Sequence, residues 1–264
     1  MTRYIILFLS IALAYLSARA DSPLIQQADS AYTSDDFATA ASLYLKAIDE
    51  EGPSAKLYYN LGNSYYRMGE SGNAILSYER ALRLDPTDED VRNNLEFVNS
   101  RITDKPGERG TFLGNALDSV SAAVRSNTWA WLAFGCFALT VAAIMAYLFA
   151  DAVAIRKTGF FGGIVTLIGC MVCMFFAFRS ASLALADDVA IITSPSTILS
   201  TVPRTPTDRS QEAMLLHEGT RVTILDSVSS MSAADSVRTV WYDVEVDNAH
   251  RAWINAADVT KVAG

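Results

Sequence analysis

Two apolar stretches without a charged residue interrupt an otherwise polar sequence. They cover residues 129–150 and residues 159–178. A helix of about 20 residues spans the roughly 30 Å hydrocarbon core of a bilayer. Residues 151–158 between them are too few for a domain, so the pattern predicts a two-helix transmembrane hairpin. Arg156 and Lys157 lie in this connection, and their charge predicts a cytoplasmic loop with both flanking parts on the other side of the membrane.

Residues 21–104, before the hairpin, repeat an apolar pattern with a period of 34. The clearer copy has its small and aromatic positions at Tyr58, Leu61, Gly62, Tyr65, Ala74, Tyr78, Ala81 and Pro86. A degenerate copy, one period earlier, retains Leu24, Ala28, Ala40, Tyr44 and Ala47. These spacings are typical of the tetratricopeptide repeat, a pair of helices that stacks into a solenoid. An apolar stripe from Val91 to Ile102 predicts a capping helix, so we expect an all-α solenoid of two repeats plus that cap.

Residues 189–264, after the hairpin, have the short alternating segments of β-strands. The candidate strands are Val189–Thr193, Thr197–Ser200, Met214–Leu216, Arg221–Asp226, Val240–Val246, Arg251–Ile254 and one near Val259–Val262. Two polar stretches, 201–213 and 227–239, are expected to be loops. The pattern predicts a small all-β barrel.

The remaining segments are a leader and two linkers. Residues 1–20 have Arg3, an apolar core and an Ala18-Arg19-Ala20 cleavage site, which predicts a secretory signal peptide; an uncleaved anchor is the alternative. Residues 105–128 form a linker with an amphipathic helix, which lies either in the membrane interface or against the solenoid. Residues 179–188 form a second linker.

The composition argues against nucleic-acid binding and offers no catalytic apparatus. The net charge is −8 and no basic run occurs, whereas phosphate binding needs clustered cations. All three cysteines lie in the hairpin, and the two histidines, His217 and His250, are too few for most metal sites or triads. His217-Glu218 precedes a glycine turn and is expected to be structural. We therefore expect no enzyme activity, no metal and no cofactor.

Two sets of residues are candidates for binding. On the tetratricopeptide pattern, the concave groove is lined by Lys56, Tyr59, Asn63, Tyr66, Arg67, Asn93 and Arg101, with Asp90 and Phe97 beside them. Amide and cationic side chains in such a row are suited to a peptide backbone or a terminal carboxylate; a merely solvated face is the alternative. Trp241 and Trp253 are candidate ligand-facing aromatics of the barrel, with packing as the alternative. Cys170 and Cys173 spell a C-x-x-C, but a thiolate is disfavoured in mid-membrane.

The order of parts resembles the tetratricopeptide protein of the bacterial aerotolerance (Bat) operon, which ends in a bacterial SH3 domain. The matching segments are Tyr59-Asn60-Leu61-Gly62-Asn63, Tyr78-Glu79-Arg80-Ala81-Leu82, Asn93-Asn94-Leu95-Glu96, Ser126-Asn127-Thr128-Trp129-Ala130, Lys157-Thr158-Gly159-Phe160-Phe161, Leu216-His217-Glu218-Gly219-Thr220 and Trp253-Ile254. The long 227–239 stretch departs from the pattern. The resemblance implies a membrane assembly with von Willebrand A-domain proteins and a MoxR-type AAA+ ATPase, linked to oxidative or envelope stress.

Three functional hypotheses follow. The first is a scaffold in the bacterial inner membrane whose periplasmic repeat and SH3-like domains bind proteins or peptides. The second is a peptidoglycan-reading protein that recruits a wall enzyme. The third is a membrane thiol-redox component that uses Cys170 and Cys173. The fold expected in each case is a multidomain membrane protein with a solenoid, a hairpin and an SH3-like barrel.

Overall fold

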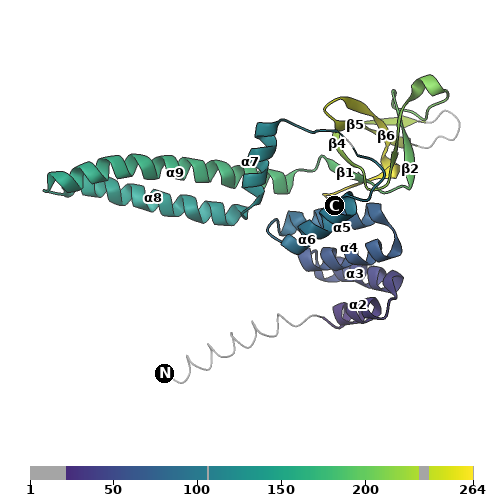
Figure 1. The fold of residues 1–264 in the computed structure, drawn as a ribbon, viewed down its shortest axis with the longest axis horizontal. Coiled ribbons are helices and arrows are strands. Elements are labelled where there is room, and N and C mark those ends of the chain that lie inside the picture. Colours follow the sequence, from purple (N-terminus) through teal and green to yellow (C-terminus); the bar gives the residue numbers. More distant parts are fainter. Residues whose placement is uncertain (1–21, 106, 232–237, 264) are drawn as a thin grey trace.

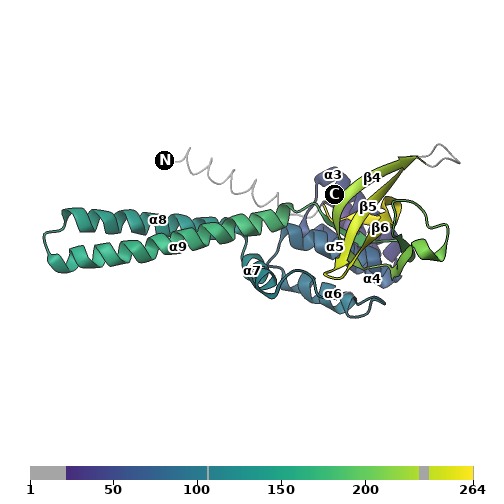
Figure 2. The same ribbon diagram turned by 90° about the horizontal axis from the view of Figure 1, so that it is seen from above.

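The structure, a computed structural model, describes residues 22–105, 107–231 and 238–263. A helical domain lies beneath an antiparallel sheet, and a long helical hairpin projects away from both (Figure 1). A view turned by 90° shows the hairpin equally clear of the two domains (Figure 2). The predicted signal peptide, residues 1–20, lies outside the described residues.

The helical domain contains α2 (Pro23–Thr33), α3 (Phe37–Glu51), α4 (Ala55–Met68), α5 (Ser71–Leu84) and α6 (Glu89–Asn99). Side-chain oxygens of Ser22, Asp36, Ser54 and Asp88 accept backbone N–H groups at the starts of α2, α3, α4 and α6. Gly69 ends α4 in the left-handed conformation that glycine adopts most readily. Two helix pairs and a capping helix are therefore present, as the 34-residue period predicts.

The close crossing of α4 and α5 depends on Gly62. A Cβ atom at this position would lie 2.6 Å from Cε1 of Tyr78. Tyr78 is 1% exposed, and Leu61 and Ala74 are buried beside the same crossing. The small residue thus lets a large aromatic ring fill the space between the two helices.

The C-terminal strands are β1 (Val189–Ile192), β2 (Ser196–Ser200), β3 (Glu212–His217), β4 (Arg221–Met231), β5 (Arg238–Asp247), β6 (His250–Asn255) and β7 (Val259–Lys261). They form an antiparallel sheet with the order β3-β2-β6-β5-β4-β1-β7. Because β3 and β7 end this order, the sheet is not closed into the predicted barrel. The helical domain covers the β7 edge instead: Arg80 donates hydrogen bonds to the carbonyl oxygens of Lys261 and Val262.

Two stretches that were expected to be loops are partly strands. In the 227–239 stretch, β4 continues to Met231 and β5 begins at Arg238, and Ser227 pairs with Tyr242. In the 201–213 stretch, a short 3-10 helix, Arg209–Gln211, leads directly into β3. Polar composition was misleading because a strand at the end of a ribbon exposes its side chains while its backbone remains paired.

The hairpin consists of α8 (Ser126–Phe149) and α9 (Val153–Leu185), both long and apolar enough to cross a membrane. The predicted loop 151–158 is wrong in extent, since α9 begins at Val153, and the predicted linker 179–188 is helical as far as Leu185. Neither segment contains a proline or glycine that would stop a helix before these points. Inside the hairpin, a Cβ at Gly159 would lie 2.6 Å from the carbonyl oxygen of Ala143, so the helices cross closely.

A short helix, α7 (Phe112–Ala122), runs crosswise to the hairpin where it meets the domains (Figure 1). It packs on α9, where Asp118 Oδ1 lies 2.7 Å from Arg179 Nε in an ion pair without the alignment of a hydrogen bond. Phe112 is 90% exposed and Leu113 is 67% exposed. The apolar face of the predicted amphipathic helix is therefore largely uncovered.

The sheet and the helical domain share one apolar core. Ile191 and Val262 are buried in the same cluster as Ile75 and Val98 of α5 and α6. Gly72 lies at this contact, because a Cβ there would be 2.8 Å from the carbonyl oxygen of Ile192 in β1.

The linker after α6 ties this contact together through carboxylates. Asp104 accepts from the backbone N–H of His217 at 2.5 Å and the hydroxyl of Thr220 at 2.8 Å, and lies 2.9 Å from Nδ1 of His217. Asp247 accepts from the backbone N–H of Gly107 at 3.0 Å. The turn after β3 thus has the structural role that the sequence indicates.

The carboxyl pKa values report the same bonds. Burial by itself raises the pKa of Asp104, but the bonds from His217 and Thr220 outweigh it and lower that pKa below its usual value. The backbone N–H of Ala249, with further bonds to the carboxylate, lowers the pKa of Asp247 to about 2.

Candidate functional site: the concave groove of the helical domain

Helices α2, α3 and α4 line a groove that contains a cavity of about 160 Å³. The lining side chains come from α2, α3 and α4 and are Asp29, Tyr32, Thr33, Tyr44, Asn60 and Asn63. One carboxylate, two phenols and two amides therefore surround a space large enough for part of a side chain. Thr33 is exposed at its rim.

Asp29 is the acceptor at the centre of this cavity. Its Oδ1 atom accepts from the hydroxyl of Tyr44 at 2.5 Å and from Nδ2 of Asn60 at 3.5 Å. Burial, followed by the contact with Asp29, raises the pKa of Tyr44 well above its ordinary value, so this phenol stays a donor. The cavity consequently presents a carboxylate to whatever enters it.

Asn63, predicted to face a ligand, lines this cavity and also holds the domain together. Its Oδ1 accepts from the hydroxyl of Tyr78 at 2.7 Å and from Nδ2 of Asn94 at 3.0 Å. The same Asn94 amide donates to the hydroxyl of Tyr59 at 3.2 Å. These bonds link α4, α5 and α6, and a buried tyrosine hydroxyl would lose its partner without Asn63. Sequence analysis missed the role of Asn94, which shares α6 with the expected Asn93.

At the α6 end of the groove, Tyr66 and Arg101 contact each other. Nη1 of Arg101 donates to the hydroxyl of Tyr66 at 3.2 Å. The Arg101 guanidinium also lies 3.9 Å from the ring centroid of Phe97, and Phe97 packs edge-on against Tyr66 at 5.7 Å. This cluster is a stacked, partly exposed platform rather than a free cation.

Arg67 is likewise held by its neighbours. Its Nη2 atom lies 3.0 Å from Oδ1 of Asp35, and its guanidinium lies 4.2 Å from the ring centroid of Phe37. Both partners belong to the first helix pair, so Arg67 joins the two repeats at the groove edge. Lys56 and Asn93 are exposed at the start of α4 and in α6.

The two tryptophans of the sheet differ in exposure. Trp241 in β5 is 4% exposed, so it presents no surface to a ligand. It packs inside the protein, which was the alternative interpretation of this residue. Trp253 in β6 is half-buried opposite Asp243. A ligand surface at Trp253 stays a prediction.

The cysteines of the hairpin are free thiols. Cys170 and Cys173 lie in the middle of α9, and Cys173 contacts Cys136 of α8 across the helix pair. In the part of the chain that the structure describes, no group of three His, Cys, Asp or Glu side chains is placed to hold a metal ion.

Comparison with known proteins identifies one repeat of the helical domain. Residues 55–88, which contain α4 and α5, match the tetratricopeptide repeat family. A segment of 72 residues, 27% of this chain, is 32% identical to the Protein SGT1 homolog of Oryza sativa subsp. japonica. The chain spans about a fifth of the length of that relative. A tetratricopeptide repeat is therefore present, and such repeats generally bind proteins or peptides.

Proposed function

We propose that this protein is a membrane-anchored, non-enzymatic scaffold whose concave groove binds a segment of a partner protein. The observation that carries the proposal is the open cavity beside Asp29, in a domain that contains a tetratricopeptide repeat. Solenoids of this kind use their concave face as a binding surface. The apolar hairpin supports a position of that groove near a membrane.

The uncovered surface of the hairpin supports membrane insertion. Phe134, Phe149 and Val165 are each more than 60% exposed, and similar side chains cover both helices along their length. Apolar surface of this extent on a projecting helix pair is costly in water and favourable in hydrocarbon. Within the hairpin, the hydroxyl of Thr140 donates to that of Thr166 at 2.8 Å, so these polar groups do not face lipid.

Aromatic side chains mark both ends of the proposed membrane segment. Trp129 stacks on Phe176 at 5.0 Å near the domains, and Tyr147 packs against Phe160 at 5.7 Å near the other end. Trp129 and Tyr147 are 18 residues apart in α8, about 27 Å along a helix and close to the thickness of a hydrocarbon core. The crosswise α7, with Phe112 exposed, then lies in the interface on the domain side.

The charges of the hairpin support the orientation that the sequence predicts. At the domain end, Arg125 pairs with Asp85 and Arg179 pairs with Asp118. At the opposite tip, Arg156 and Lys157 are the cations. Cations flank the cytoplasmic side of membrane helices, so we place the tip in the cytoplasm and both domains in the periplasm of a bacterial inner membrane.

The groove favours a partner segment that donates hydrogen bonds. Arg67 and Arg101 are already engaged, so a terminal carboxylate finds no free cation among them. Asp29 instead offers an acceptor to a backbone N–H or a cationic side chain. The resemblance to aerotolerance proteins nominates von Willebrand A-domain proteins and a MoxR-type ATPase system as partners, in a complex linked to envelope stress.

A pull-down with the full chain in detergent tests this proposal. Thr33→Trp places an indole at the rim of the cavity, whereas Ser30→Trp adds the same ring to an exposed position of α2 that does not line it. We expect the first variant to lose its partner and the second to keep it, with both equally stable. Equal recovery of the partner by both variants would exclude this cavity as the binding site.

A further inference from the structure

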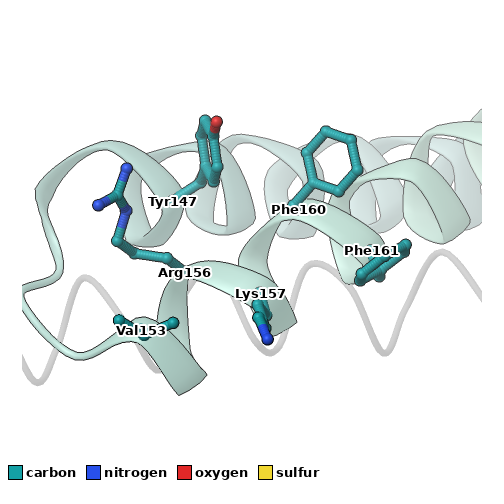
Figure 3. Close-up of a pocket in the computed structure, with 6 residues that line it drawn as sticks. All are labelled: Tyr147, Val153, Arg156, Lys157, Phe160 and Phe161. Atoms are coloured by element: carbon teal, nitrogen blue, oxygen red, sulfur yellow. The ribbon is translucent and has the colours of Figure 1, made fainter.

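The tip of the hairpin contains a cavity of about 320 Å³ on the surface of α8 and α9. Its lining is Tyr147, Val153, Arg156, Lys157, Phe160 and Phe161 (Figure 3). Two cations and three aromatic rings therefore line the surface where the helices turn. None of these residues belongs to the groove.

The cations at the tip have no carboxylate partner in the part of the chain that the structure describes, unlike those at the base of the hairpin, its end next to the domains. Arg125 and Arg179 at the base each pair with a carboxylate. Among the described residues, no carboxylate pairs with Arg156 or Lys157, and both side chains are exposed. Asp151, the nearby acid, forms no ion pair with them, so within the described residues the tip presents two unpaired cations and has a net positive charge.

The aromatic rings fix how this charge is presented. The Arg156 guanidinium lies 5.7 Å from the ring centroid of Tyr147, and Figure 3 shows Tyr147 and Phe160 on the same side of the hairpin as Arg156. A guanidinium above a phenol keeps its N–H donors directed outward. Phe160 and Phe161, which follow the two cations along α9, extend the apolar surface toward the hydrocarbon, where an acyl chain would lie.

We propose that the hairpin tip binds the phosphate headgroup of an anionic phospholipid. The cations lie just beyond Tyr147, at headgroup depth, and the apolar part of the cavity continues toward the hydrocarbon. Basic pockets between membrane helices recognise such headgroups, and anionic lipids attract membrane-flanking cations. The inference rests on the proposed membrane insertion and deepens it, because the lipid would hold the hairpin at a defined depth.

The test uses the full chain in nanodiscs of phosphatidylcholine with a minority of phosphatidylglycerol, and native mass spectrometry to count retained phosphatidylglycerol. We expect retention to fall roughly fivefold for Arg156→Gln or Lys157→Gln alone, and roughly thirtyfold for both. Asp151→Asn should raise it. The matched control is Arg125→Gln with Arg179→Gln, which removes the same charge from the base and should leave retention unchanged.

Other outcomes would contradict the lipid site, the kind of ligand or the membrane insertion. Equal losses from the tip and base variants would show bulk charge attraction and overturn the site. Displacement of the lipid by inorganic phosphate would identify a free-phosphate site instead. Carbonate extraction separates the two proposals: a soluble wild type refutes membrane insertion, whereas an insoluble wild type without lipid preference refutes the lipid site alone.

Discussion

The helical domain has two polar surfaces that use similar side chains in opposite ways. Toward the sheet, Arg80 and Asp104 bond backbone groups that lie more than 100 residues away in the chain. On the concave side, Asp29 accepts from Asn60 and Arg67 pairs with Asp35, each in the neighbouring repeat, and a cavity lies beside Asp29. The first surface fixes one domain on another, and the second keeps room for a partner. Substitutions should therefore cost stability at the first and binding at the second.

The largest loss of stability is expected where the groove itself is built. Gly62→Leu forces a side chain into the ring of Tyr78, and overpacking of this kind costs about 1–3 kcal/mol or more. We expect the free energy of unfolding of the repeats to fall by roughly 3 kcal/mol in chemical denaturation. A Leu variant as stable as the wild type would contradict the close crossing.

The next effect concerns the contact between linker and sheet. Asp104→Ala removes the acceptor of the His217 backbone N–H and of the buried Thr220 hydroxyl, which should cost about 2–3 kcal/mol. The control is Asp49→Ala, an exposed acid of α3, for which a change within about 0.5 kcal/mol is expected. Similar losses in both variants would mean that Asp104 acts only through net charge.

Acid should weaken the same contact. The pKa values of Asp104 and Asp247 are lowered in the folded protein, the latter to about 2, so both carboxylates stabilise it fully above the ordinary carboxyl pKa of about 4. That stability is lost as pH falls from about 4 through the folded values. Hydrogen exchange of β3 and of residues 104–110 should accelerate over this window before the core of α4 and α5 does. If the exchange rates of these residues stay constant down to pH 2, the two carboxylates do not stabilise this contact.

A smaller effect is expected at the apolar part of the contact. Alanine favours helices more than glycine does, yet Gly72→Ala places a Cβ 2.8 Å from the Ile192 carbonyl oxygen. We expect a net loss of about 1–2 kcal/mol and faster proteolysis between the domains. Ser71→Ala, one residue earlier in α5, should be nearly neutral. A stabilised Gly72→Ala variant would show that the sheet does not dock on α5.

The smallest effect on stability is expected in the groove. Arg67→Ala breaks an exposed ion pair with Asp35, and such pairs contribute at most about 1 kcal/mol. The thermal midpoint should therefore hardly change, and partner recovery in a pull-down should stay close to that of the wild type, because Arg67 does not line the cavity beside Asp29. A variant that unfolds would show that Arg67 is essential to the contact between the two repeats.

The sequence predicts single elements well and their mutual contacts poorly. Alternation located the strands within a few residues, and the 34-residue period located the helices, because both patterns are local. The docking of the sheet was not predictable, since Asp104 meets His217 across 113 positions with no periodic signal between them. The structural role of Asn63 was missed for the same reason, because only the placement of α6 beside α4 shows that Asn94 donates to it. Trp241 lies on the opposite face of β5 from Val244 and Val246, which are buried, yet it is itself buried.

The central claim is that a partner segment enters the groove beside Asp29, and photocrosslinking in native membranes tests it most directly. A photoreactive amino acid at Thr33, on the rim of the cavity, should form a discrete crosslinked adduct in intact cells. The same residue at Ser30, one turn earlier on α2 and outside the cavity, should form little or none. Equal adducts from the two positions, or adducts from Ser30 alone, would contradict the account.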